Sequence, residues 1–208
     1  LTRYNDLLEH QIYKNNPAVL NMLNAKYVMN GDIYEVNPGA LGNAWWVSRV
    51  DYVPDADREM AALDSLDTRT AAVADRRFEK TLGQASAPAP GDTIYETSYA
   101  PNRLTYTAST ARGGVAVFSE IYFPWGWSAE IDGRPAEIGR VNYVLRALRV
   151  PAGRHDITFT FDPQSLRVTN ALSVTAVVLI YVVCAVAIAV PLWMRRRNAA
   201  SPVREKKG

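Results

Sequence analysis

A group of aromatic and polar residues between positions 120 and 146 has the chemistry needed to bind a sugar. Aromatic rings pack against the apolar C–H faces of a sugar, while the sugar hydroxyls need paired polar partners. The sequence therefore predicts a glycan-binding surface here, with packing of the same aromatic rings inside a core as the alternative. The group consists of Trp125, Tyr122, Tyr143, Glu120, Asp132, Asn142 and Arg146.

Several of these residues also have a simple structural interpretation. Trp127 alternates with Ala129 and Ile131, so core packing is favoured for that ring, whereas Trp125 lies in a turn and either role is open. A buried ion pair between Glu120 and Arg146 is as well founded as a ligand site. Asp132-Gly133 is most simply a hairpin turn, because both positions of such a turn need φ > 0.

Catalytic and metal-binding patterns are weak. Ser119, Asp132 and His155 have the side chains of a hydrolytic triad, but no G-x-S-x-G context surrounds the serine. The two histidines, His10 and His155, are not accompanied by a Cys or Asp/Glu cluster at metal-ligand spacing. We therefore assign no catalytic residue, no metal site and no cofactor.

The strands that must position these residues lie between positions 115 and 161. Apolar residues alternate with polar ones in four runs, near 115–122, 127–131, 141–150 and 156–161. Pro- and Gly-containing turns separate the runs. The pattern predicts a four-stranded antiparallel meander with one apolar face.

The rest of the chain adds short strands and a few helices. Asn16-Pro17 predicts a helix start, Asn30-Gly31-Asp32 a hairpin turn, and Asp55 the cap of a short helix with Leu63 on its apolar face. Further strands are expected near 44–52, 70–75, 93–99 and 103–110. The sequence therefore predicts a mainly β fold, an antiparallel β-sandwich with a few short helices.

An uncharged stretch follows this domain. Ala171–Met194 has 24 residues, which as a helix measures about 36 Å and can cross a hydrocarbon core of about 30 Å. Trp193 and the cluster Arg195, Arg196 and Arg197 have the types expected of a membrane anchor. We therefore predict one C-terminal transmembrane α-helix in contact with a lipid bilayer.

Charge is unevenly distributed along the chain. Up to Asn170 there are 17 Lys and Arg against 20 Asp and Glu, while six basic residues and one acid follow Met194. A mildly acidic body makes nucleic acid an improbable partner. The positive-inside rule predicts a cytoplasmic tail at 195–208 and an extracytoplasmic side for 1–167.

Four parts follow from these features: a helical segment at 1–24, a β-sandwich domain at 25–167, a membrane helix at 168–194 and a basic tail at 195–208. The single cysteine, Cys184, lies in the membrane helix, so no disulfide is expected in the β-sandwich. Because the chain begins at Leu1 rather than at Met, we expect it to be the C-terminal part of a longer protein.

Several segments resemble one bacterial protein family. FSEIYFPWGWSAEIDG at 118–133, followed by VNYVLRALRVPAGRHDITFTFDP at 141–163 and one terminal span, resembles the C-terminal end of the YfhO family of polytopic membrane proteins. Three upstream pieces fit the same family: LNMLNAKYVM at 20–29, GNAWWVSRV at 42–50 and SYAPNRLTY at 98–106.

The resemblance implies a function for the intact protein. YfhO-like proteins are similar to GT-C glycosyltransferases, which transfer a sugar from a polyprenyl-phosphate donor on the outer face of the cytoplasmic membrane. Their acidic catalytic residues are expected in an early outer loop, which this segment does not contain. The resemblance thus implies a multi-pass protein whose upstream membrane helices contact this accessory domain, with a cell-envelope glycopolymer or lipid as acceptor. A non-catalytic, membrane-tethered module that binds carbohydrate or protein is the alternative, and a purely structural domain is a third.

Overall fold

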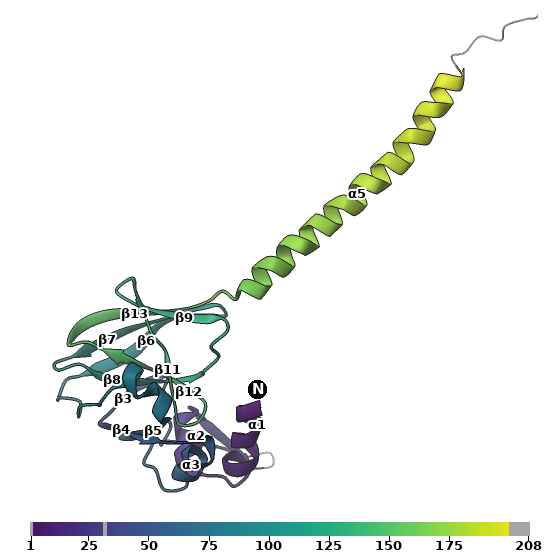
Figure 1. Cartoon of the computed structure of the whole chain (residues 1–208). Coiled ribbons are helices and arrows are strands. Elements are labelled where there is room, and N and C mark those ends of the chain that lie inside the picture. The colour runs from purple at the N-terminus through teal and green to yellow at the C-terminus, as the bar shows by residue number, and fades with distance from the viewer. Residues whose placement is uncertain (1, 31–32, 200–208) are drawn as a thin grey trace, which may run out of the picture. The chain divides into compact units, whose positions relative to one another are not determined.

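The computed structural model of the chain describes residues 2–30 and 33–199 (Figure 1). It divides into two compact units, residues 1–162 and residues 163–208. The first unit holds all the strands and the short helices, and the second holds one long helix. The two units are described separately below.

Two antiparallel sheets form the sandwich of the first unit. In strand order, the larger sheet contains β10 (Arg134–Ala136), β9 (Trp127–Ile131), β13 (Gly153–Phe161), β7 (Arg103–Thr110) and β6 (Thr93–Ala100). The smaller contains β11 (Gly139–Val141), β12 (Leu145–Val150), β8 (Gly114–Ile121) and β3 (Ala44–Val47). The predicted mainly β, antiparallel architecture is confirmed.

Aromatic rings from both sheets meet in the core of the sandwich. Phe118 of β8 packs edge-to-face on Tyr106 of β7 and on Phe159 of β13, with ring centroids 4.9 Å apart in both pairs. All three side chains are at most 1% exposed. Edge-to-face packing is favourable because the electron-poor edge of one ring meets the electron-rich face of the next.

The predicted meander is wrong in its connectivity. β8 and β12 pair with each other in the smaller sheet, while β9 and β13 pair in the larger one, so the chain crosses between the sheets. The break at Phe123-Pro124 provides the first crossing, because proline cannot continue a strand ladder. The predicted Asp132-Gly133 hairpin is confirmed, since φ is 52° and 73° at these residues and β9 pairs with β10 across them.

The predicted strand 141–150 is also interrupted. Asn142 and Tyr143 have φ of 49° and 72°, a left-handed conformation that no strand contains. Asn142 docks onto Val73 instead: its backbone N–H donates to the Val73 carbonyl at 2.7 Å, and its side-chain Oδ1 accepts from the Val73 N–H at 3.0 Å. The side-chain amide thus replaces a strand neighbour for β5 (Ala71–Asp75).

A smaller layer packs beside the sandwich. β5 pairs in parallel with β4 (Arg49–Val53), and α3 (Ala56–Ala62) lies between these two strands in the chain. Asp55 caps α3 as predicted, accepting from the Arg58 N–H at 2.9 Å. The parallel pairing was not predicted, and neither were the helical turns η2 (Arg76–Phe78) and α4 (Glu79–Leu82).

The N-terminal part is helical. It contains α1 (Thr2–Leu7), the π-helical turn η1 (Leu8–Ile12) and α2 (Pro17–Met22). Asn16 caps α2 as predicted, since its Oδ1 accepts from the Ala18 N–H at 3.0 Å. A hairpin of β1 (Tyr27–Asn30) and β2 (Ile33–Val36) follows, and Gly31 and Asp32 of its predicted turn lie outside the described residues.

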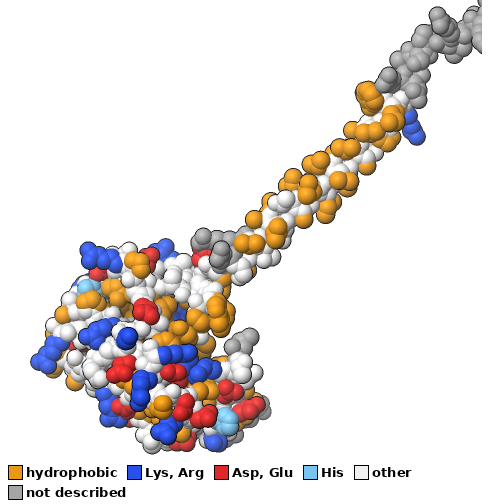
Figure 2. Space-filling view, in the orientation of Figure 1, with side chains coloured by type: hydrophobic (Ala, Val, Ile, Leu, Met, Phe, Trp, Pro, Cys, Tyr) orange, Lys and Arg blue, Asp and Glu red, His pale blue; other side chains and the backbone are white. Residues whose placement is uncertain are grey.

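The second unit contains α5 (Gln164–Ala199). Within it, Val168–Arg196 is long and apolar enough to cross a membrane. Figure 2 shows hydrophobic side chains along this helix and basic ones near its C-terminal end. The predicted C-terminal apolar helix is confirmed.

Candidate functional site

A pocket of about 240 Å³ lies where the edges of the two sheets meet. The segment after β8, the strands β9 and β10, and β12 all contribute to its wall. Of the ten described residues that line it, Arg146 alone carries a charge. The others are Tyr122, Phe123, Pro124, Trp127, Ser128, Ala129, Pro135, Ala136 and Ile138.

Arg146 reaches the pocket from a β-bulge. The β12–β8 register shifts between Leu145 and Arg146, and such a bulge re-aims the side chain next to it. The Arg146 guanidinium is 3% exposed, and its Nε donates to the Ile121 carbonyl at 3.0 Å. It lies 4.0 Å from the centroid of the Trp127 ring, within the range of a cation–π contact.

The charge of Arg146 is only partly compensated. Glu120 Oε2 lies 3.8 Å from Arg146 Nη2, beyond hydrogen-bond distance, and buried Nη1 has no hydrogen-bond partner. Burial lowers the pKa of Arg146 to about 10, against the opposing effect of Glu120. Burial likewise raises the pKa of Glu120, while Arg146 lowers it. The pocket therefore has a positively charged wall with unused donor capacity.

An aromatic edge borders the pocket. Trp125 is 75% exposed and packs edge-to-face on Phe123, with ring centroids 5.4 Å apart. Phe161, at the end of β13, packs against the Trp127 ring at 5.2 Å. The structure thus brings Tyr122, Trp127 and Arg146 together and places Trp125 and Glu120 at their border.

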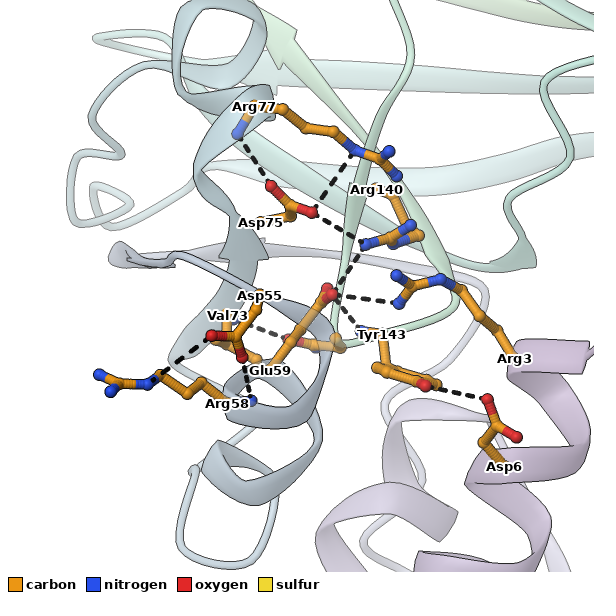
Figure 3. Close-up of polar contacts among 11 residues, drawn as sticks. Arg3, Asp6, Asp55, Arg58, Glu59, Val73, Asp75, Arg77, Arg140 and Tyr143 are labelled. Atoms are coloured by element: carbon orange, nitrogen blue, oxygen red, sulfur yellow. Dashed lines mark hydrogen bonds and ion pairs between the residues drawn. The ribbon is translucent and has the colours of Figure 1, made fainter.

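Tyr143 lies in a different cluster of polar contacts (Figure 3), and Asn142 directly precedes it in the chain. Asn142 is fully buried and bonded to Val73, as described above. The Tyr143 hydroxyl donates to Asp6 Oδ2 at 3.0 Å, and its ring lies 4.5 Å from the Arg3 guanidinium carbon. The Tyr143 contacts connect the loop before β12 to α1, while the Asn142 bonds connect the same loop to β5.

Glu59 is the centre of that cluster. Its carboxylate is fully buried and accepts hydrogen bonds from Arg140 Nη2 at 2.8 Å, from the Tyr143 N–H at 3.0 Å and from Arg3 Nη1 at 3.3 Å. Asp75 lies 4.0 Å from Arg140. Burial lowers the pKa of Arg140, and Glu59 opposes that shift. Glu59 thus has two arginine partners at hydrogen-bond distance, whereas Glu120 and Arg146 at the pocket are 3.8 Å apart.

The part of the chain that contains the pocket matches a known protein family. The family described as "Bacterial membrane protein YfhO" matches residues 75–173, a range that includes every pocket residue and the start of the apolar helix. Over residues 75–173 the chain matches the YfhO family. No curated protein and no solved structure matches the chain significantly.

Asp132 lies away from the pocket lining, in the β9–β10 turn. Its Oδ2 lies 2.6 Å from His155 Nδ1, and its Oδ1 accepts from the Asp156 N–H at 2.9 Å. The Ser119 hydroxyl donates to the Met22 carbonyl at 2.7 Å rather than to a histidine. No group of three or more potential metal ligands occurs among the residues that were described.

The pocket also contains residues that the sequence pattern did not single out. They are Phe123, Pro124, Ser128, Pro135, Ala136 and Ile138. Pro124 follows the end of β8, and Pro135 is the middle residue of the edge strand β10. The two prolines are the available signal, because proline marks edges where a sheet stops and a pocket can open. The pairing of β9 with β13 rather than with β8 brings these residues opposite Arg146, and no local pattern predicts that pairing.

Proposed function

We propose that the β-sandwich of this YfhO-family chain is a non-catalytic glycan-binding domain of a membrane-bound sugar transferase. Transfer would run from a polyprenyl-phosphate sugar to a cell-envelope glycopolymer or lipid, with the catalytic residues outside this segment. Residues 1–167 would then lie on the extracytoplasmic side and the tail 195–208 in the cytoplasm of a multi-pass bacterial protein. The sugar-transfer part of this proposal is supported by the resemblance alone.

The observation that carries the binding role is the pocket around Arg146. Its volume of about 240 Å³ lies below the roughly 300–1,000 Å³ of typical drug-sized sites, which suits a single sugar ring. Trp127 and Tyr122 offer aromatic surface for the C–H face of that ring. Arg146 offers donors for a hydroxyl, a carboxylate or a phosphate.

A membrane-tethered binding module without any transferase activity is the second candidate. The pocket supports this binding module directly, because binding requires only residues of the β-sandwich. The two candidates differ in the activity of the intact protein. Purified intact protein that transfers sugar from a polyprenyl-phosphate donor supports the first, and binding without transfer supports the second.

Glycan binding can be tested on the chain reconstituted in lipid nanodiscs. Neutral and acidic monosaccharides and sugar phosphates would be titrated while tryptophan fluorescence is followed, because Trp127 lies in the pocket wall. We expect Arg146→Met to weaken binding about tenfold or more, since one good charged hydrogen bond is worth about 1.5–3 kcal/mol. Trp125→Ala should also weaken binding, because it removes an aromatic surface at the border of the pocket. Tyr95→Ala is the matched control, because Tyr95 is a half-exposed aromatic residue outside the pocket.

Methionine keeps the length of the Arg146 stem over Trp127, so loss of the charge is separated from loss of packing. Equal affinity in the wild type and in both pocket variants, with folding retained, would contradict glycan binding at this site. In the intact transferase, the same variants should raise KM for the acceptor and leave kcat close to the wild-type value.

A further inference from the structure

The β1–β2 hairpin has one face made only of apolar side chains. Tyr27 pairs with Val36 and Met29 pairs with Tyr34, so these four residues share a face. They are 61–77% exposed and surround an open concavity of about 550 Å³. The opposite face is different, because Val28 pairs there with the charged Glu35. We call the four apolar residues the hairpin face.

The hairpin is held firmly at its base. The Asn37 side chain donates to the Ala25 carbonyl at 2.9 Å and to Asn21 Oδ1 at 2.8 Å, and the Asn37 N–H donates to the Lys26 carbonyl at 2.8 Å. The Tyr27 and Tyr34 rings pack edge-to-face at 5.9 Å. A two-stranded hairpin is marginal in water, so a defined hairpin with an uncovered apolar face indicates a partner for that face.

The size of the hairpin face argues against a stable protein partner. Four such side chains offer on the order of 500 Å² of apolar surface, given about 150–250 Å² for each large aromatic residue. Stable protein–protein complexes bury about 800 Å² per partner. A bilayer needs no such minimum area, because the chain is already anchored by the apolar helix Val168–Arg196 and stays within reach of a membrane surface.

We propose that the hairpin face is a membrane-docking surface that inserts shallowly into the lipid bilayer that anchors the chain. Tyr27 and Tyr34 are suited to this position, since tyrosine places an apolar ring in the acyl region and a hydroxyl among the headgroups. Met29 and Val36 add flexible apolar surface between them. Lys26, which is exposed and directly precedes β1, adds a positive charge next to the hairpin that anionic lipid would attract.

Depth-dependent fluorescence quenching tests this proposal on the full chain. With Cys184→Ala removing the native cysteine, Met29→Cys is labelled with a small fluorophore and the chain is placed in phosphatidylethanolamine–phosphatidylglycerol vesicles. Interfacial segments lie about 5–10 Å into the headgroup–acyl boundary, so we expect acyl-brominated lipid to remove on the order of half of the emission. The same label at Tyr95→Cys, on β6, should lose little.

A double variant, Tyr27→Asn with Tyr34→Asn, separates docking from folding. Both side chains are largely exposed, so the melting temperature should stay near that of the wild type while quenching at position 29 falls toward the Tyr95 control. Quenching at position 29 no greater than at position 95 would overturn the proposal. So would a label that is shielded from aqueous iodide but not quenched by lipid, because a protein partner would then cover the hairpin face.

Discussion

Glu59 and Arg140 form a hydrogen-bonded ion pair at 2.8 Å, although 81 residues separate them in the sequence. The Glu59 side chain is fully buried and that of Arg140 is 3% exposed. The pair connects α3 to β11, and the Glu59 bond to the Tyr143 N–H fixes the loop between β11 and β12. That loop positions the first residues of β12, the strand that carries Arg146.

Removing one partner of this pair should destabilise the domain strongly. Glu59→Gln leaves the buried Arg140 guanidinium without its hydrogen-bonded counter-charge, with only Asp75 at 4.0 Å remaining, and breaking a buried pair costs about 3–5 kcal/mol. Denaturant unfolding followed by circular dichroism measures this change. The double variant Glu59→Met with Arg140→Met should be destabilised less than the sum of the two single changes, because neither of the two buried charges is left facing an uncharged partner. Additive effects would show that the two side chains act independently.

Asn142→Ala should destabilise the domain by about 1–3 kcal/mol. The change leaves the buried Val73 N–H without its side-chain acceptor and forces alanine into φ near 49°. Asn142→Gly relieves the backbone strain but not the lost hydrogen bond, so it should fall between the wild type and Asn142→Ala. Thermal melts of the three proteins check this order. A glycine variant as stable as the wild type would rule out a contribution from the Asn142–Val73 bond.

The sequence predicted local elements well where the signals are local. Alternation, the Asp132-Gly133 turn, the caps at Asn16 and Asp55, and the uncharged helix all depend on residues close together in the chain. The sequence did not predict which strands pair with each other. Alternation shows that a strand has an apolar face, but it does not show to which of the two sheets the strand belongs. The break in the strand at Asn142 was not predicted either, because it depends on hydrogen bonds to Val73, 69 residues earlier in the chain.

The candidate site was predicted in part. Tyr122 and Arg146 line the pocket and Trp125 borders it, whereas Asn142 and Tyr143 belong to the Glu59 cluster. The positive φ values at Asn142 and Tyr143 turn these two side chains away from the strand faces that alternation assigns to them. Residue type alone therefore grouped side chains that the backbone separates.

The Asp132–His155 contact should make stability depend on pH. The hydrogen bond to Asp132 raises the pKa of His155, and the same bond lowers the pKa of Asp132. The contribution of His155 is therefore complete below its unfolded pKa of about 6.5 and is lost as pH rises through the higher folded value. The contribution of Asp132 is present above about pH 4 and is lost on acidification.

Asp132→Asn is the variant that reveals this dependence, because Asn-Gly keeps the turn and the side-chain oxygen can still accept from the Asp156 N–H. The melting temperature of the wild type should exceed that of Asp132→Asn near pH 5.5, and the difference should shrink toward pH 8.5. A constant difference across this range would contradict a role for protonated His155. An NMR titration of the His155 ring checks the raised pKa directly.

Gly126→Ala should disturb the aromatic edge of the pocket. A Cβ at this position would overlap the Phe161 ring, which packs against Trp127 at 5.2 Å and Phe123 at 6.4 Å. Because overpacking costs about 1–3 kcal/mol, the variant should lose stability by that amount and shift its tryptophan emission as the Phe161 ring moves. Gly133→Asn is the control, since nothing lies within 4 Å of a Cβ there and asparagine tolerates the left-handed conformation. A stable Gly126→Ala variant with wild-type emission would show that the Phe161 ring can move without affecting Trp127.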